Sequence, residues 1–221
     1  MKYIIFMAIF FLLMSCNTKY NIIDTGLANG KFDGNMYEYL QSNSYDWDST
    51  CLMIERANLV DLFEGKREGF EQITFFGPTN HSIRRYMLDN EIASIMEMDE
   101  EFCHEMIMRC VVKGKYMRDD IPFGKNTASE NSGEDGYDDG SDNADENQGT
   151  GGTVLKGAMG NRFWIYSFKE SYNDVAGVGA VVLYIKSLET GGTMIDVAST
   201  DIEPTNGVVH SLHYNFTLGD L

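Results

Sequence analysis

Residues able to carry out chemistry are few in this chain, and their spacing assembles no metal or nucleophilic site. His210 and His213 form a His-x-x-His pair in a β-prone run, where residues three apart point to opposite faces and share no metal ion. His104 stands beside Cys103 and Glu105 but lacks a second ligand pair at metal spacing. No serine lies in a Gly-x-Ser-x-Gly elbow. We therefore predict no catalytic residue, no metal and no cofactor, and a protein that is not an enzyme.

Two other segments, residues 73–80 and 205–214, each join an apolar run to a Thr-Asn pair at a turn. In the first, proline lacks a backbone donor, so Gly-Pro ends a strand, and Thr79 or Asn80 is predicted to cap the helix that follows. In the second, Asn-Gly favours a turn with positive φ that leads into the last strand. His210 within that strand is predicted to be buried and hydrogen-bonded to backbone.

Hydrophobic periodicity predicts helices early in the chain and strands late, which is an α+β plan. The expected helices are 36–44, a second one capped at Asp48-Ser49, a short one ending near Gly65, one after Asn80, and 100–108. The expected strands are 73–76, one beginning at Val111-Val112, 162–168, 180–185, 194–198 and 208–216.

This order, with its two motifs, resembles the fasciclin (FAS1) domain family. The matching motif residues are Thr74, Phe76, Pro78, Thr79 and Asn80 in the first segment, and Thr205, Asn206, Gly207, Val208 and His210 in the second. The resemblance implies a FAS1-like wedge or sandwich of short strands with helices packed at one side, and an extracellular interaction module. Arg109-Cys110 stands where that family has a Tyr-His pair, so the adhesive roles attributed to that pair are not transferred. We expect the partner surface at this departure and at the acidic insertion described below.

The N-terminus resembles a bacterial lipoprotein signal. Residues 1–15 combine a positive start with an apolar run that is short for a membrane span, and the run leads to Cys16, the expected lipidation site. Residues 16–31 are then a tether and residues 32–221 one domain. This predicts a palmitate-bearing protein on the envelope of a Gram-negative bacterium, at the outer membrane, with the membrane face left open.

Acidic residues dominate the chain, which has 34 Asp and Glu against 17 Lys and Arg, a net charge of −17. Such a surface repels a phosphate backbone, so we expect no nucleic-acid partner. Residues 126–153 are rich in acids and poor in apolar residues, and they are predicted to form a disordered insertion. Their aspartates do not fit the spacing of an EF-hand calcium loop.

The expected function is a lipid-anchored, non-catalytic interaction module that binds an envelope protein or glycan. The alternative is an accessory glycan-binding lipoprotein of a carbohydrate-uptake system, in which aromatic side chains stack on sugars; packing within the fold is the other fate of these residues. The candidates are Trp47, Trp164, Tyr166 and Tyr184. Cys51, Cys103 and Cys110 are predicted to be small buried hydrophobes.

Overall fold

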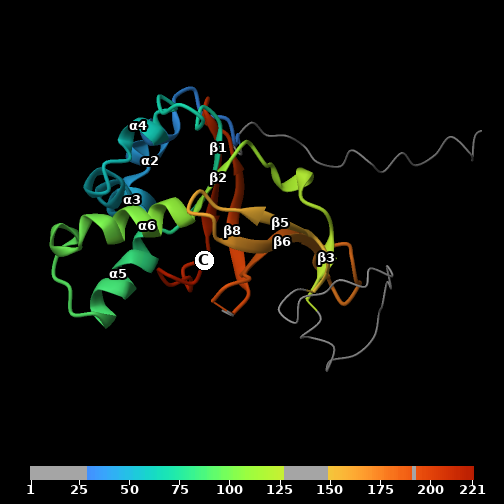
Figure 1. Ribbon diagram of the computed structural model, residues 1–221. Helices are drawn as coiled ribbons and strands as arrows, with labels where there is room; N and C mark the ends of the chain where they lie inside the picture. Colours follow the sequence, from blue (N-terminus) through green and yellow to red (C-terminus); the bar gives the residue numbers. More distant parts are fainter. Residues whose placement is uncertain (1–28, 127–148, 191–192) are drawn as a thin grey trace, which may run out of the picture.

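The computed structural model describes residues 29–126, 149–190 and 193–221 of the chain (Figure 1). The signal segment, Cys16 and most of the predicted tether lie outside the described residues. In the described part, no helix is both long and apolar enough to cross a membrane. The elements in chain order are α2 (Met36–Ser42), α3 (Ser44–Arg56), α4 (Val60–Phe63), β1 (Ile73–Gly77), α5 (Asn80–Asp89), the 3₁₀ turn η2 (Ile95–Glu97), α6 (Glu100–Arg109), β2 (Val111–Lys113), the 3₁₀ turn η3 (Arg118–Asp120), β3 (Gly124–Lys125), β4 (Thr150–Gly151), β5 (Thr153–Lys156), β6 (Arg162–Lys169), β7 (Val181–Ser187), β8 (Ile195–Ile202) and β9 (Gly207–Leu212).

The predicted α+β fold is confirmed. Seven strands form one sheet in the order β2-β1-β9-β8-β7-β6-β5, and β3 pairs with β4 in a separate ribbon. Neighbouring strands of the large sheet are antiparallel, with the exception of the parallel pair β1 and β9. Helices α2 to α6 lie together on one side of the molecule, to the left in Figure 1.

The sheet curls until its two outer strands meet. A single antiparallel bridge joins Val112 of β2 to Gly157, the residue that follows β5. Next to it, the Ala158 N–H donates to the Val111 carbonyl at 2.8 Å. In Figure 1, β5 and β6 accordingly run across the direction of β1 and β8. The expected wedge is therefore one curled sheet, which closes because the right-handed twist accumulates from strand to strand.

Adjacent phenylalanines of β1 belong to two different parts of the core, because successive side chains of a strand point to opposite faces. Phe75 faces the helices, with its ring centroid 4.8 Å from that of Phe63 and 6.5 Å from that of Trp47. Phe76 faces the inside of the curl, 5.5 Å from Phe163 of β6. The strand is thus buried on both sides, and all five of its residues are buried.

The small β3–β4 ribbon covers an aromatic ladder on the outer face of β6 and β7. The rings of Trp164, Tyr166 and Tyr184 stack at centroid distances of 4.4 and 5.3 Å. A side chain at Gly124 or Gly152 would overlap Tyr166, so glycine allows the ribbon backbone to lie directly on the rings.

This ribbon corrects the expected limits of the acidic insertion, whose residues 127–148 lie outside the described part. Thr150–Gly151 is paired with Gly124–Lys125, and Thr153 begins β5, so the C-terminal end of the predicted disordered segment is part of the fold. The composition of 149–153 is loop-like, but the glycines serve close packing. The described end of the tether is likewise attached, because Glu203 N–H donates to the Gly30 carbonyl at 2.7 Å and Lys31 forms a bridge with Glu203.

Local sequence signals predicted most of the helices, but the predicted start of the second helix was wrong. Asn35 caps α2 in a capping box with Glu38, as the composition of a helix start favours. Helix α3, however, begins at Ser44, so Asp48-Ser49 lies in its interior and not at its start. The helix starts earlier because its buried face includes Trp47, Cys51 and Ile54, spaced at about one helical turn.

Candidate functional site

The two sequence motifs lie side by side on β1 and β9, the second and third strands of the sheet counted from β2. Strand β9 runs parallel to β1, with Ile73 opposite Gly207, Thr74 opposite Val208 and Phe76 opposite His210. Eight of the ten motif residues are buried; Asn80 is partly buried and Thr205 is exposed. Partners contact exposed atoms, so these two buried motif segments stabilise the fold and do not themselves form a binding surface.

Asn206, at the start of β9, attaches two helices to the sheet through its buried side-chain amide. Its Oδ1 accepts from the Met36 N–H at 2.7 Å, and its Nδ2 donates to the Phe63 carbonyl at 2.9 Å. These groups belong to the start of α2 and the end of α4, where backbone groups lack partners within the helix. Thr205 adds two bonds to the Gly34 carbonyl, from its N–H at 2.9 Å and its hydroxyl at 3.0 Å.

Asn80 makes the equivalent connection at the opposite end of the strand pair. Its Oδ1 accepts from the Ser49 N–H at 2.6 Å, and its Nδ2 donates to the carbonyls of Ser44 and Tyr45 at 3.0 and 2.8 Å. Of the two expected caps, Asn80 is therefore not the one: it joins α3 to α5 across the fold. Thr79 occupies the N-cap position of α5 but makes no side-chain cap bond, and its buried hydroxyl has no hydrogen-bond partner within the described residues.

Pro78 completes the first motif by accepting a tertiary hydrogen bond. The Thr50 hydroxyl of α3 donates to the Pro78 carbonyl at 2.6 Å, inside the core. Thr74 makes similar bonds to the segment that follows β2: its hydroxyl donates to the Gly114 carbonyl at 2.8 Å and accepts from the Tyr116 N–H at 2.9 Å. Both motif residues thus hold a neighbouring segment against β1.

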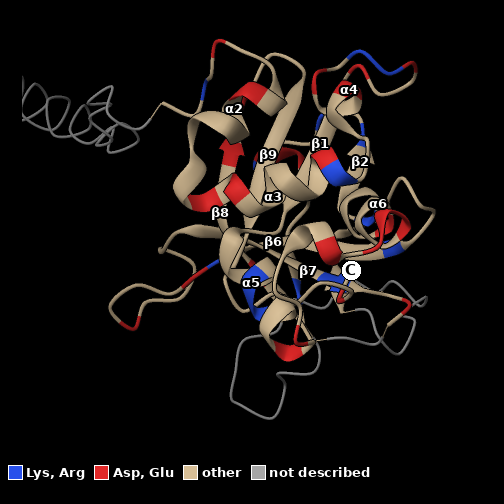
Figure 2. Cartoon of the chain, turned by 90° about the vertical axis from the view of Figure 1, so that its left-hand side faces the viewer, with Lys and Arg blue, Asp and Glu red and all other residues tan. Residues whose placement is uncertain are grey.

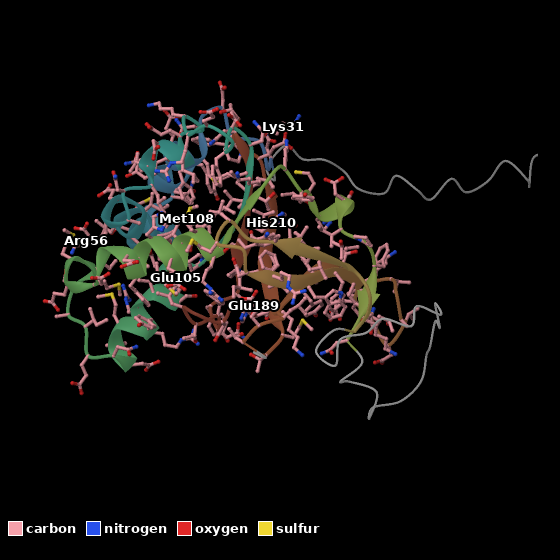
Figure 3. The ribbon with its side chains drawn as sticks, in the orientation of Figure 1. Lys31, Arg56, Glu105, Met108, Glu189 and His210 are labelled. Atoms are coloured by element: carbon pink, nitrogen blue, oxygen red, sulfur yellow. The ribbon has the colours of Figure 1, made fainter. Side chains whose placement is uncertain are left out.

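His210 is fully buried and bonded to backbone, as predicted (Figure 3). Its Nε2 lies 2.8 Å from the Tyr116 carbonyl, and its Nδ1 accepts from the Asp201 N–H at 3.4 Å. This pattern suits the neutral ring with the proton on Nε2. The ring also stacks on Phe76 at 5.2 Å. Burial lowers the pKa of His210 below its ordinary value, against the opposing effects of the Tyr116 carbonyl and the Asp201 charge.

Gly207 is required at the start of β9 for two reasons. Its φ of 150° is one that residues with a side chain rarely adopt, and a Cβ at this position would overlap the Ile73 carbonyl. The close approach lets β9 pair with β1 from its first residue. The predicted turn with positive φ is therefore confirmed.

Arg109-Cys110, expected to mark the partner surface, offers little accessible surface, since Arg109 is half-buried and Cys110 is buried. The Cys110 side chain is buried, and desolvation raises the pKa of its thiol to about 12. The Arg109 guanidinium, only 17% exposed, donates to the Leu221 carbonyl, and the Arg109 carbonyl accepts from the Asn161 side chain at 3.1 Å. For this pair the expectation fails, because position in the sequence does not report burial; the acidic insertion, the other part of the expectation, lies outside the described residues.

The proposed aromatic sugar platform is also not available to a ligand. Trp47 and Trp164 are 2% and 0% exposed, and Tyr166 is 4% exposed. The Trp164 Nε1–H donates to the Gly151 carbonyl at 2.9 Å, and the Tyr184 hydroxyl donates to Glu170 at 2.6 Å. Trp47, Trp164 and Tyr166 thus pack within the fold, which was the other interpretation of the sequence, while Tyr184 is partly exposed. The glycan-binding alternative loses three of its four stacking residues.

A pocket of about 690 Å³ lies where the two outer strands of the sheet meet. Sequence reasoning did not identify it, because its walls come from segments about forty residues apart, and only the bridge between them places them together. Its lining contains two lysines and no acid: Val112, Lys113, Tyr116, Val154, Leu155, Lys156, Gly157, Ala158, Met159 and Gly160. Among the described residues, no group of three or more His, Cys, Asp and Glu side chains is arranged to hold a metal ion.

Comparisons with known proteins find a likeness among solved structures. No family model and no curated protein matches the sequence. Among solved structures, the chain is similar to a FAS1 domain pair from the insect cell adhesion molecule Fasciclin I, with 11% sequence identity and a TM-score of 0.41. The match covers 83% of this chain and 46% of that one, so this chain spans just under half of its length.

Proposed function

We propose that this protein is a non-catalytic interaction module of the fasciclin type, held at a bacterial cell envelope by a lipid on Cys16. The observation that supports it best is the pairing of the two motif segments. Residues 134 positions apart form a parallel, buried strand pair, and an asparagine at each end of the pair binds the helical layer. Ten positions of sequence resemblance therefore coincide with one connected structural unit.

In this proposal the motifs maintain the fold, and the partner binds elsewhere. Their buried side chains are committed to internal hydrogen bonds. The partner is an envelope protein or glycan, and it contacts the exposed surface. Acidic positions lie on α2, α3 and α6 of the helical side (Figure 2), which favours a cationic or neutral partner there over an anionic one.

Lipid anchoring is tested with Cys16→Ala in the full chain, expressed in a Gram-negative host. We expect the variant to lose radiolabelled palmitate and to move from the membrane to the soluble fraction. Cys51→Ala is the matched control, because it removes a buried thiol and leaves the proposed lipidation site intact. Equal membrane retention and labelling of both variants would overturn the anchoring proposal.

The interaction role is tested by capture from envelope extract and by binding to a glycan panel. The bait is the wild-type protein, and the control is Asn206→Ala, which we expect to unfold partly and to lose any specific partner. A partner retained by the wild type alone supports the proposal. Turnover of a substrate by the purified protein, abolished by substitution of a single pocket residue, would instead show an enzyme.

A further inference from the structure

Three basic residues lie in a row across the outer face of three neighbouring strands. Lys156 of β5 is directly opposite Arg162 of β6. On the other side of β5, the antiparallel bridge between Val112 and Gly157 places Lys113 of β2 opposite Lys156. Directly opposed residues in an antiparallel pair have Cβ atoms about 4.5–5.5 Å apart and point to the same face. We call Lys113, Lys156 and Arg162 the cationic row.

Like charges placed directly opposite each other destabilise a sheet, and within the described part of the chain this row has no compensating acid in direct contact. Across residues 29–126, 149–190 and 193–221, none of its three side chains has an acidic oxygen within 4.0 Å. Two carboxylates lie near without pairing with it. The backbone N–H of Gly69 is the main cause that lowers the pKa of Glu71, and the charge of Lys113 adds a smaller effect. Glu189 accepts from the backbone N–H of Arg162 at 3.2 Å.

The positive row is unusual in a chain with a net charge of −17. All three of its side chains are exposed. Lys113 is held in place, because its ammonium group lies 4.2 Å from the centre of the Phe70 ring. The contact with Phe70 therefore keeps one of the three mutually repelling side chains ordered, and all three charges are accessible from solvent.

The row borders the pocket between β2 and β5, and both lysines are among its lining residues. The remaining wall is largely apolar. Val154 and Met159 are 40% and 47% exposed, which is high for side chains of their kind, and Tyr116 adds an aromatic side. The site thus combines a partly apolar depression with positive charges along its rim.

We propose that this surface binds an acidic segment of a protein partner, with an apolar side chain in the pocket and flanking carboxylates on the cationic row. The inference rests on the proposed function, since it names the surface and the partner class of the same interaction module. An acidic peptide satisfies both features at once: its carboxylates relieve the repulsion within the row, and its apolar residue covers Val154 and Met159. A polyuronate would satisfy the charges alone and would leave the apolar wall exposed to water.

The test uses the full 221-residue chain and a fluorescent synthetic peptide in which one leucine is flanked on each side by four glutamates. Fluorescence anisotropy measures its affinity at low and at physiological ionic strength. We expect binding that weakens as salt is added, because exposed charge pairs are screened. Each of Lys113→Gln, Lys156→Gln and Arg162→Gln is expected to lower the affinity about 2–5-fold, and the triple variant by more than about tenfold.

Matched variants separate the contribution of the cationic row to the affinity from that of general surface charge, and the contribution of the pocket from that of the row. Lys169→Gln, at the far end of β6, removes another exposed cation of the same strand and should leave the affinity within about twofold. Met159→Ala, together with a peptide in which alanine replaces leucine, tests the apolar contact; each should weaken binding and the two losses should not add. Circular dichroism confirms that each variant is folded.

The proposal is overturned if the peptide does not bind, if the triple variant binds it as tightly as the Lys169→Gln control, or if polygalacturonate binds the row while the peptide does not. Failure here is distinct from failure of the proposed function. If an envelope partner is captured equally by the wild type and by the triple variant, the protein remains an interaction module, and its partner binds another surface.

Discussion

Replacing Asn206 by alanine should destabilise the domain more than any exposed asparagine substitution does. The change removes the acceptor for the Met36 N–H and the donor to the Phe63 carbonyl. Both of these backbone groups are at helix ends, and Asn206, at 7% exposure, is their partner in the core. A buried polar group left without a partner costs about 1–3 kcal/mol. With two such groups, we expect a loss of about 3–4 kcal/mol in the free energy of unfolding.

The measurement is urea unfolding of the wild type and the variant, followed by far-UV circular dichroism. For a domain of this size, a loss of that order corresponds to a fall in Tm of roughly 6–16 °C. Asn90→Ala is the matched control, since Asn90 makes one bond to the Tyr86 carbonyl at an exposed helix end and should change stability by less than about 1 kcal/mol. A loss below about 1 kcal/mol for Asn206→Ala, with an unchanged m-value, would refute the idea that this amide holds helices to sheet.

Three further predictions follow from the same contacts. First, the folded protein keeps His210 neutral, with its pKa below the ordinary 6.5. The unfolded chain therefore binds more protons, and stability falls as the pH drops below about 6.5. In urea titrations, His210→Gln should lose less free energy of unfolding between pH 7.5 and 5.5 than the wild type, and an equal loss in both proteins would contradict this. Second, Gly207→Ala should lower the free energy of unfolding by more than about 3 kcal/mol, because strain at positive φ is added to overlap with Ile73. Gly177→Ala, where φ is also positive but the space is open, should lower it by about 1 kcal/mol. Similar losses in the two variants would exclude the overlap. Third, Cys51 and Cys110 are buried, with thiol pKa values raised to about 12, so iodoacetamide at pH 8 should label them only after denaturation. Mass spectrometry detects the label, and rapid labelling of the native protein would argue against the packing of these side chains.

The sequence predicted the elements that local signals specify. The strand 73–76, the end of α4 near Gly65 and the helix 100–108 agree with the structure within a few residues. Each has a local physical cause: β-branched and aromatic residues before Gly-Pro, a glycine able to adopt positive φ, and Asp99, which caps α6 by accepting from two N–H groups. Where the signal was ambiguous, as at Asp48-Ser49, the burial of Trp47 decided the helix start.

Side-chain roles were predicted less well than elements. Thr79 and Asn80 have the composition of helix caps, and only the packing of α3 against α5 shows that Asn80 joins the two helices. The tryptophans have the composition of a sugar platform, and only the β3–β4 ribbon shows that Trp164 is covered. In both cases, residue type limits which bonds are possible, and the neighbours supplied by the fold determine which bond forms.

By itself, the sequence determined the α+β plan, the two motif segments and the burial of His210, because these depend on periodicity and local backbone preference. The tertiary structure alone decided that β1 and β9 pair in parallel, that the sheet closes at Val112 and Gly157, and that Lys113, Lys156 and Arg162 form one row. Strand register and sheet curl depend on contacts between residues far apart in the chain, and no local preference encodes them.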